Sequence, residues 1–312
     1  MTAPPDAIAV AAARLGRRAQ AGVALGPLTT YRVGGPAALF VDVEDDDDLH
    51  ALAGAVRASG VATLAVGKGS NLLVADAGFD GLAFRLGDRY ASVDVDGTTV
   101  LAGGAASLPV VARRTAAAGL TGFEWAVGVP GSVGGAVRMN AGGHGSDMAA
   151  VVRRVRVVDL LGDEDVAVPA AALAFGYRRS AVVATQVVVS AELALEEGHA
   201  ATAEAAVADV VRWRRAHQPG GSNAGSVFTN PPGDSAARLV DEAGGRGLRI
   251  GSAQVSPKHA NFIQADDGGS ADDVFALMAA VQRLVHDRTG VDLVPETRLV
   301  GFHRTGDGAL AR

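Results

Sequence analysis

Residues 122–145 read GFEWAVGVPGSVGGAVRMNAGGHG, and this stretch decides how the rest of the chain is interpreted. It holds eight glycines and one proline in an otherwise apolar segment with few charges. Glycine loses more conformational entropy on folding than any other residue, so this density requires a reason. One reason is that backbone N–H groups approach a large anion with no Cβ in the way. The alternative is a set of tight turns in a glycine-rich sheet domain, and the segment alone does not decide between the two.

A second glycine-rich turn, Gly67-Lys68-Gly69-Ser70-Asn71-Leu72, follows a strand expected over residues 62–66. Its backbone donors, its short polar side chains and the charge of its lysine suit a pyrophosphate. The turn lacks the dinucleotide fingerprint, because the Gly-x-Gly-x-x-Gly pattern fails at Leu72, and it lacks the spacing of a Walker loop. Two separate anion-binding loops fit a dinucleotide held from both sides better than a single phosphate.

Composition excludes several classes of function. The chain has 312 residues, a net charge of −6, 48% hydrophobic residues and no cysteine. We therefore expect neither a nucleic-acid surface nor disulfides, thiolate metal sites or a cysteine nucleophile, and we expect no metal site. No apolar run reaches the length of a membrane span, and the first 20 residues lack the order of a secretory signal, so we expect a cytoplasmic protein without a membrane partner.

The hydrophobic periodicity predicts an α+β fold in at least two parts, with a boundary near residue 205. Ser270 and Asp273 predict a capping box at the start of a long helix that ends at Gly290. The other helices are expected over residues 7–19, 46–58, 107–118, 203–215 and 235–243, and strands over 37–43, 62–66, 82–86, 98–101, 155–160, 164–168, 186–193 and 260–264.

Five further motifs occur in order between about Thr29 and Gly301: TYRVGGP at 30–36, GYR at 176–178, GSVFTNP at 225–231, KHANF at 258–262 and PETR at 295–298. Together with the two glycine-rich loops they resemble the UDP-N-acetylenolpyruvoylglucosamine reductase family. The flavin-binding half of that family has the vanillyl-alcohol-oxidase-type (PCMH) fold. The resemblance implies an FAD-binding region in two parts, residues 1–86 with 298–312 returning to it and residues 87–205, followed by a substrate-binding domain at 206–297.

The resemblance also implies a reaction. FAD is reduced by NADPH, and a hydride then passes to the enolpyruvyl group of a UDP-sugar to give UDP-N-acetylmuramate, a precursor of peptidoglycan. Such a reaction needs a cation on the substrate carboxylate and a positioned proton donor. By the match to the family, Arg178 stabilises the carboxylate, Ser226 delivers the proton and Glu296 helps to polarise or protonate the developing enolate.

The remaining site residues are implied in the same way. Those expected to bind FAD are Tyr31, Arg32, Gly67, Lys68, Gly69, Ser70, Asn71, Leu72, Val129, Pro130, Gly131, Ser132, Gly134, Gly135, Asn140, Ala141 and Gly142. Those expected to bind the UDP-sugar are Tyr177, His217, Asn230, Lys258 and His259.

The chain departs from the family pattern in three places. The tyrosine-bearing insertion that some members carry after Tyr177-Arg178 is missing, which indicates the shorter subtype. His217 stands where a lysine is usual, and His144 where a tyrosine is frequent. Two alternatives stay open: a flavin oxidase of the same fold acting on a sugar or hydroxy acid, and a nucleotide-sugar-binding or regulatory protein without catalysis. We expect a monomer.

Overall fold

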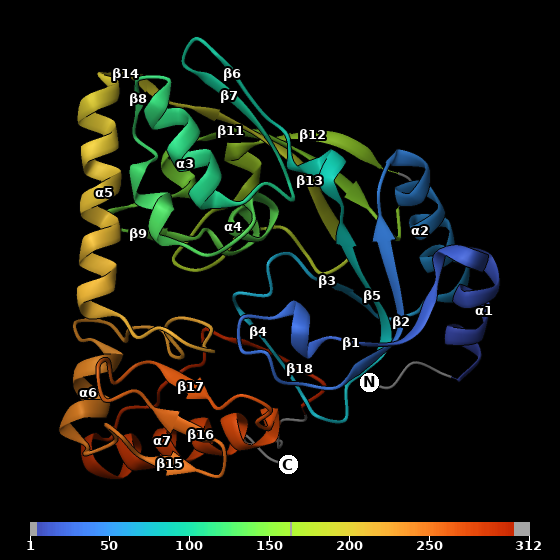
Figure 1. Ribbon diagram of the computed structural model, residues 1–312. Helices are drawn as coiled ribbons and strands as arrows, with labels where there is room; N and C mark the ends of the chain where they lie inside the picture. The colour runs from blue at the N-terminus through green and yellow to red at the C-terminus, as the bar shows by residue number, and fades with distance from the viewer. Residues whose placement is uncertain (1–4, 163, 303–312) are drawn as a thin grey trace. The chain divides into compact units, whose positions relative to one another are not determined.

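The computed structural model describes residues 5–162 and 164–302 and divides into two compact units (Figure 1). Unit 1 consists of residues 5–21, 39–68 and 81–214, and unit 2 of residues 22–38, 69–80 and 215–302. Each unit is thus assembled from three separate segments. The boundary expected near residue 205 falls inside helix α5 (Ala200–His217), and contacts divide the chain at Arg214–Arg215 instead.

The first sheet has the strand order β1 (Gln20–Ala24), β2 (Pro36–Val43), β5 (Phe79–Leu86) and β3 (Thr63–Ala65). In unit 1, helices α1 (Pro5–Leu15) and α2 (Asp46–Ser59) contribute to the same hydrophobic cluster as strands β2, β5 and β3. The Asp45 carboxylate accepts a hydrogen bond from the Asp48 N–H at the start of α2, and Gly60 with φ +63° ends the helix. Leu49, Leu52 and Val56 are buried on one face, as the spacing predicts.

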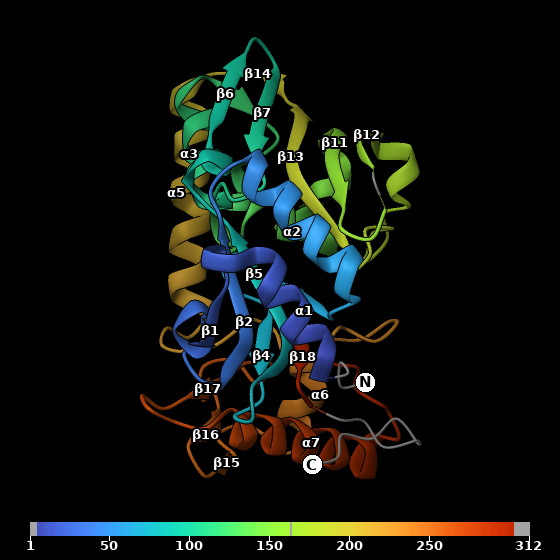
Figure 2. The ribbon, with the colours of Figure 1, turned by 90° about the vertical axis from the view of Figure 1, so that its right-hand side faces the viewer.

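The second sheet of unit 1 is antiparallel, with the order β12 (Asp165–Pro169), β11 (Val152–Asp159), β13 (Gln186–Ala194), β7 (Thr99–Gly103) and β6 (Val93–Asp96). Helices α3 (Leu108–Ala117), α4 (Val133–Met139) and α5 share a hydrophobic cluster with this sheet. Figure 2 shows the strands of the sheet together with α3 and α5. The strands expected near 98–101, 155–160, 164–168 and 186–193 are confirmed within a few residues.

Unit 2 has a small antiparallel sheet, β15 (Arg249–Ile250), β16 (Ala253–Val255) and β17 (Ile263–Ala265), with helices α6 (Ala236–Glu242) and α7 (Ala271–Thr289). A parallel pair joins β18 (Arg298–Val300) to β4 (Leu72–Val74), so the end of the described chain returns to a segment far earlier in the sequence. Residues 303–312, which belong to the expected return, lie outside the described residues. One hydrophobic cluster draws on all these elements, with Ile250 of β15 and Leu299 of β18 packed against its buried residues.

Short elements complete the chain, and the sequence did not predict them. The strands are β8 (Leu120–Thr121), β9 (Gly142–Gly143), β10 (Ser146–Asp147) and β14 (Glu196–Glu197), and the 3₁₀ turns are Gly16–Arg18, Gly26–Leu28, Asp88–Ala91, Glu124–Gly128, Met148–Ala150 and Ala170–Leu173. Within the described residues no helix combines the length and apolar character needed to cross a membrane.

The predicted capping box of α7 forms only in part. The Ser270 hydroxyl accepts a hydrogen bond from the Asp273 N–H at 3.2 Å, as expected. The Asp273 carboxylate, however, accepts from the N–H and the hydroxyl of Ser252, both at 2.8 Å, and the Ser270 N–H donates to the Ser252 hydroxyl at 2.8 Å. The Asp76 carboxylate supplies further acceptors for the first turn, taking hydrogen bonds from the N–H groups of Ala271 (2.9 Å) and Asp272 (3.2 Å). A cap supplied by residue 76 ties the second segment of unit 2 to its longest helix.

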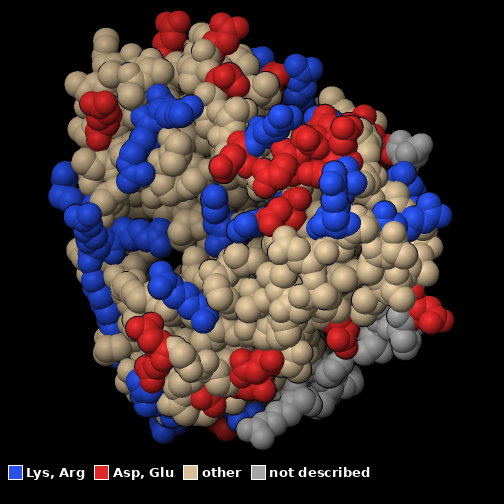
Figure 3. Space-filling view, turned by 45° about the vertical axis from the view of Figure 1, so that its right-hand side comes forward, with Lys and Arg blue, Asp and Glu red and all other residues tan. Residues whose placement is uncertain are grey.

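Charged side chains are mixed on the face that Figure 3 shows, where a group of acidic residues is bordered by basic ones. The acidic start of α2 has such partners within unit 1. Asp48 pairs with Arg18 at 2.7 Å, and Asp46 pairs with Arg156 at 3.1 Å. The tyrosine hydroxyl of Tyr90 and the guanidinium of Arg156 keep the pKa of Asp46 below its usual value.

Candidate functional site

The two glycine-rich loops meet within unit 1. A Cβ atom on Gly67 would lie 2.5 Å from the Ser132 hydroxyl, so a side chain at position 67 would displace this hydroxyl. Around Ser132 the second loop is fixed by main-chain hydrogen bonds, from Leu108 N–H to Gly131 O and from Gly134 N–H to Gly104 O, each 2.9 Å long. The structure therefore brings together two stretches that are about 65 residues apart, as expected for loops that share a ligand.

The second half of the first loop belongs to unit 2, where it lies between two other segments. Gly69 has φ +60°, and a Cβ on it would lie 2.2 Å from the Leu28 carbonyl oxygen. The Thr30 N–H donates to Gly69 O at 3.2 Å, and the Arg298 N–H donates to Asn71 O at 2.9 Å. Ser70 is half-buried, and Leu72 is buried in β4.

The Asn71 side chain connects this loop to a proposed catalytic residue. Its Nδ2 group donates to the Glu296 carbonyl oxygen at 3.1 Å. Asn71 was expected to bind FAD, and the structure shows its amide holding the Glu296 backbone within unit 2. One side chain therefore connects the first glycine-rich loop to the backbone of Glu296.

Three buried hydroxyls of unit 2 have no hydrogen-bond partner among the described residues: those of Thr30, Tyr31 and Thr297. Tyr31 is fully buried, and this burial raises the pKa of its phenol above the usual value. Leaving a buried donor unsatisfied is costly, and such groups are common where a ligand completes the bonding. Arg32 beside them is exposed and has φ +58°. The three unsatisfied hydroxyls of unit 2 fit a ligand with many polar atoms, such as FAD.

Asn140, also expected to bind FAD, has a side chain engaged within unit 1. It caps α4 with φ +40° and is only 3% exposed. Its Nδ2 group donates to the Asp147 carboxylate (3.0 Å) and to the Gly176 carbonyl (3.1 Å), and its Oδ1 accepts from the Ala149 N–H (2.9 Å). The following residues are pinned by the pairing of β9 with β10, in which Gly142 lies opposite Asp147. The amide thus fixes the fold around the loop, and Ala141 and Gly142 are half-buried beside it.

Arg178 lies in a tight turn of unit 1. The Gly176 N–H donates to Arg179 O at 3.0 Å, and the Arg179 N–H donates to Gly176 O at 3.1 Å. Arg178 itself has φ +56°, the left-handed region that residues other than glycine rarely adopt. The centre of its guanidinium lies 5.2 Å from the centre of the Tyr177 ring, and Tyr177 is 60% exposed.

Ser226 and Glu296 lie on neighbouring segments of unit 2. The Glu296 N–H donates to Val227 O at 2.8 Å, and Phe228 pairs with Pro295 in an isolated β-bridge. Both Ser226 and Glu296 are half-buried. Backbone pairing thus brings the expected proton donor and the third catalytic residue together, although 70 positions separate them in the sequence.

The sequence did not indicate the part played by Asn261 in this arrangement. Its carbonyl oxygen accepts from the Val227 N–H at 2.9 Å. Its side chain forms two hydrogen bonds to the main chain of Phe228, 3.0 Å to the N–H and 2.8 Å to the carbonyl. Asn261 is part of the KHANF motif, but its residue type alone gives no sign of a partner 33 positions away.

Lys258 and His259 precede Asn261 and lie in unit 2. The Lys258 ammonium donates to the Arg215 carbonyl at 2.5 Å. His259 Nδ1 accepts from the Asn261 N–H at 3.3 Å, which leaves the ring proton on Nε2 when the ring is neutral. Burial, with the charge of Arg246 as a smaller cause, lowers the pKa of His259. His217 is exposed at the end of α5.

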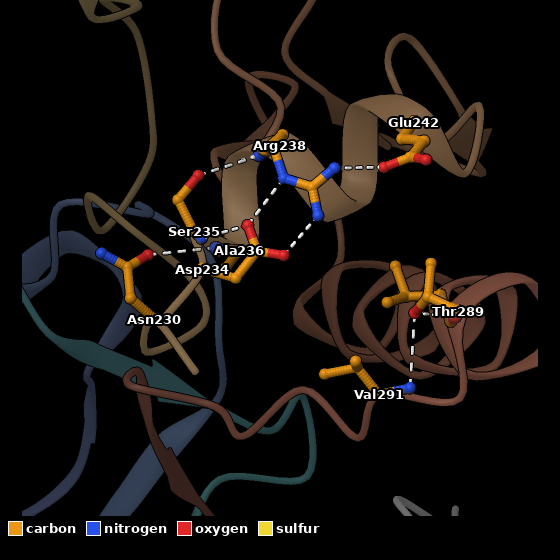
Figure 4. A network of polar contacts seen from close by, with 9 residues as sticks. Asn230, Asp234, Ser235, Ala236, Arg238, Glu242, Thr289 and Val291 are labelled. Carbon is orange, nitrogen blue, oxygen red and sulfur yellow. Dashed lines mark hydrogen bonds and ion pairs between the residues drawn. The ribbon is translucent and has the colours of Figure 1, made fainter. Parts of the chain in front are cut away.

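Asn230 lies at the start of α6 (Figure 4). Its Oδ1 accepts a hydrogen bond from the Ala236 N–H at 3.0 Å, and in Figure 4 its amide nitrogen points away from the helix. Ser235 caps the same helix by accepting from the Arg238 N–H at 3.2 Å. Asn230 can therefore hold α6 with one end of its amide and offer the other end to a ligand.

His144, which replaces the tyrosine frequent in the family pattern, packs against α5. Its ring lies edge-on to that of Trp213, with 4.9 Å between the ring centres and an angle of 85° between the planes. A Cβ on Gly128 would lie 3.6 Å from the ring of His144. His144 therefore fits between the glycine-rich segment and α5 within unit 1.

Taken by unit, the structure divides the expected site residues into two sets. Unit 1 contains Gly67, Lys68, Val129, Pro130, Gly131, Ser132, Gly134, Gly135, Asn140, Ala141, Gly142, Tyr177 and Arg178, and unit 2 contains Tyr31, Arg32, Gly69, Ser70, Asn71, Leu72, His217, Ser226, Asn230, Lys258, His259 and Glu296. Within the described residues, no group of three or more His, Asp or Glu side chains is arranged to hold a metal ion.

Comparison with known proteins finds a matching family model for each of two regions of the chain. A family model described as an FAD binding domain matches residues 37–164, and one described as the UDP-N-acetylenolpyruvoylglucosamine reductase C-terminal domain matches residues 217–300. The UDP-N-acetylenolpyruvoylglucosamine reductase of Acidiphilium cryptum is 43% identical over 282 residues, which cover 90% of each chain. Reductase 2 of Symbiobacterium thermophilum is 42% identical over 277 residues, 88% of this chain and 90% of that protein.

A solved structure extends the likeness to the fold. The crystal structure of the UDP-N-acetylenolpyruvylglucosamine reductase from Thermus caldophilus matches with a TM-score of 0.78 and 35% identity, covering 90% of this chain and 98% of that one. The chain therefore belongs to the UDP-N-acetylenolpyruvoylglucosamine reductase family and combines a PCMH-type FAD-binding region with the C-terminal domain of that family.

Proposed function

We propose that this protein catalyses the NADPH-dependent reduction of UDP-N-acetyl-3-O-(1-carboxyvinyl)-glucosamine to UDP-N-acetylmuramate, in the synthesis of peptidoglycan precursors. Family membership supports the reaction. The structural observation that supports it most is the pairing of Glu296 N–H with Val227 O at 2.8 Å, which brings the Ser226 and Glu296 segments side by side. We include in the proposal that the enzyme is a cytoplasmic monomer.

Three side chains of the protein take part in the proposed reaction. Bound FAD supplies hydride transfer, from NADPH to the terminal carbon of the enolpyruvyl group. Negative charge then develops on the adjacent carbon and its carboxylate. The planar guanidinium of Arg178 suits two carboxylate oxygens at once, Ser226 gives its hydroxyl proton to the adjacent carbon, and Glu296 assists this protonation.

The groups proposed to bind FAD belong to the two glycine-rich loops. The main chain of residues 67–71 and 129–135, with the charge of Lys68, would hold the pyrophosphate of FAD. The close approach of Gly67 to Ser132 supports a shared ligand. Tyr177, Asn230, Lys258, His259 and His217 would bind the UDP-sugar, and the outward amide nitrogen of Asn230 supports its inclusion.

The variant Ser226→Ala tests this assignment, because it removes the proposed proton donor alone. In anaerobic rapid mixing we expect flavin reduction by NADPH at nearly the normal rate and almost complete loss of flavin re-oxidation by the enolpyruvyl nucleotide. Ser270→Ala is the control, since it removes a hydroxyl that caps α7 in the same unit. It is expected to keep both half-reactions.

Two outcomes would contradict the proposal. If Ser226→Ala re-oxidises as fast as the parent protein, Ser226 is not the donor. If the parent protein instead consumes oxygen rapidly with a sugar or a hydroxy acid, it is an oxidase of the same fold.

A further inference from the structure

We propose that the side chain of Asn140 is a positioning residue for Arg178, holding the strained turn that presents this arginine. The inference rests on the proposed function, because it takes Arg178 as the group that binds the substrate carboxylate. In this proposal the Asn140 amide positions the catalytic arginine, whereas the sequence motif implied that Asn140 binds the cofactor.

The first argument is the backbone of Arg178. Its φ of +56° is unfavourable for a side chain with a Cβ, and such a conformation persists only where surrounding contacts determine it. The two hydrogen bonds between Gly176 and Arg179 close the turn but do not attach it to the rest of unit 1. Something outside the turn must hold it.

The second argument is that the attachment comes from the end of α4. Asn140 donates to the Gly176 carbonyl at 3.1 Å, at one end of the turn. At the other end the Ser180 hydroxyl donates to the Arg138 carbonyl at 2.8 Å. Both tethers lead to the last turn and cap of the same helix, so the position of α4 sets the position of the Arg178 turn.

The third argument is that α4 also begins at the proposed cofactor loop. Ser132 is its N-cap, with the Gly135 N–H as donor, and the helix spans only Val133–Met139. One short rigid element therefore links the loop expected to hold FAD with the turn that carries Arg178. The Asn140 amide connects the C-terminal end of α4 to this turn. The amide is almost completely buried and forms three hydrogen bonds, so it has little freedom to move.

The variant Asn140→Asp tests the proposal with little other change. Aspartate tolerates the left-handed backbone as asparagine does, and its oxygen can still accept from the Ala149 N–H. It cannot donate to Gly176 O. We expect the rate constant for flavin re-oxidation by the enolpyruvyl nucleotide to fall roughly 10- to 100-fold, the cost of a small misplacement of a catalytic group, while reduction by NADPH changes less than about twofold.

A second ligand separates misplacement of Arg178 from general damage. UDP-N-acetylglucosamine lacks the carboxylate that Arg178 would bind. In calorimetric titrations Asn140→Asp should weaken the enolpyruvyl nucleotide about tenfold or more and leave UDP-N-acetylglucosamine within about twofold. Equal weakening of both ligands would overturn the proposal.

In Asn140→Asp a new negative charge lies beside Asp147, and this charge could itself slow flavin re-oxidation. The double variant Asn140→Asp/Asp147→Asn tests that alternative. It restores a donor–acceptor pair between positions 140 and 147 but not the bond to Gly176. We expect it to stay slow in re-oxidation, and full recovery would contradict the proposal. Ser180→Ala, which cuts the other tether, should give a smaller loss in the same step.

FAD content decides between the two assignments of Asn140. If Asn140→Asp loses FAD and both half-reactions in proportion, the side chain is a cofactor ligand and the proposal fails. If the parent protein is not re-oxidised by the enolpyruvyl nucleotide at all, the proposed function has failed. In that case the tether is judged by amide hydrogen exchange at Arg179 N–H, which Asn140→Asp should speed up if Asn140 holds the turn.

Discussion

In unit 2 the proposed catalytic residues are placed mainly by main-chain hydrogen bonds, whereas in unit 1 Arg178 is placed by side chains that hold a strained turn. Val227, next to Ser226, bonds through its N–H to Asn261 O and through its carbonyl to Glu296 N–H. Arg178 instead has φ +56°, and its turn is held by side-chain bonds of Asn140 and Ser180 besides the main-chain bond from Ala181 N–H to Leu173 O. Main-chain pairing survives many side-chain substitutions, while a side-chain tether is lost with one. We therefore expect a single side-chain substitution near the site to lower mainly the stability in unit 2 and mainly the rate of flavin re-oxidation in unit 1.

The largest expected effect tests the unit 2 side of this comparison. Asn261→Ala leaves the N–H and carbonyl of Phe228 buried without their partners, and should lower the free energy of unfolding by about 2–4 kcal/mol. The folded variant should still re-oxidise within a few-fold of the parent rate, because the main-chain bonds of Val227 remain. Denaturant titration and rapid mixing measure the two quantities. A variant that is stable but cannot be re-oxidised would show that Asn261 acts as Asn140 is proposed to act.

A smaller effect on stability is expected from relieving the strain in unit 1. Arg178→Gly and Arg178→Ala both remove the guanidinium and should both abolish productive re-oxidation. Glycine accepts φ +56° without strain, so Arg178→Gly should be about 1 kcal/mol more stable than Arg178→Ala. Thermal and denaturant unfolding of the pair measure this difference. Equal stability of the two variants would mean that the turn stores no strain.

The smallest expected effect is on pH dependence, which should differ between the units. Burial lowers the pKa of His259 in unit 2, so its neutral form favours the folded state. This stability is present above the unfolded pKa of about 6.5 and is lost as the pH falls from there through the folded pKa. In unit 1 hydrogen bonds from Tyr90 and Arg156 lower the pKa of Asp46, so its contribution is lost only at more acidic pH, below the unfolded pKa of about 4.

Hydrogen exchange at amides of each unit, followed from pH 7 to pH 5, checks this order. Unit 2 should lose protection first, and His259→Gln should remove most of that loss. Earlier loss of protection in unit 1 would contradict it.

The sequence predicted the long elements well and the short ones poorly, for a physical reason. Helices such as α2 and α7 carry their own caps and apolar faces, so local pattern determines them. Helix α4 contains Gly134 and Gly135, which disfavour helix, and is held by the Ser132 cap and by bonds to residues 104 and 106. The pair β4–β18 has three residues in each strand and forms across more than 220 positions, which no local pattern reveals.

The same limit applies to the candidate site. The match to the family motifs predicts Ser226, Glu296 and Arg178 as the catalytic residues. The motifs did not show that Asn140 bonds to Gly176 or that Asn261 bonds to Phe228, because those partners lie 36 and 33 positions away. Supporting contacts of this kind depend on the fold, and only the structure gives them.

The most direct test of the central claim is the absorbance of the purified protein in an anaerobic cycle. The account predicts a yellow protein with a flavin spectrum, bleached by NADPH and restored by one equivalent of the enolpyruvyl UDP-sugar with formation of UDP-N-acetylmuramate. A colourless protein that takes up no FAD, or a bleached flavin that this nucleotide does not re-oxidise, would contradict it.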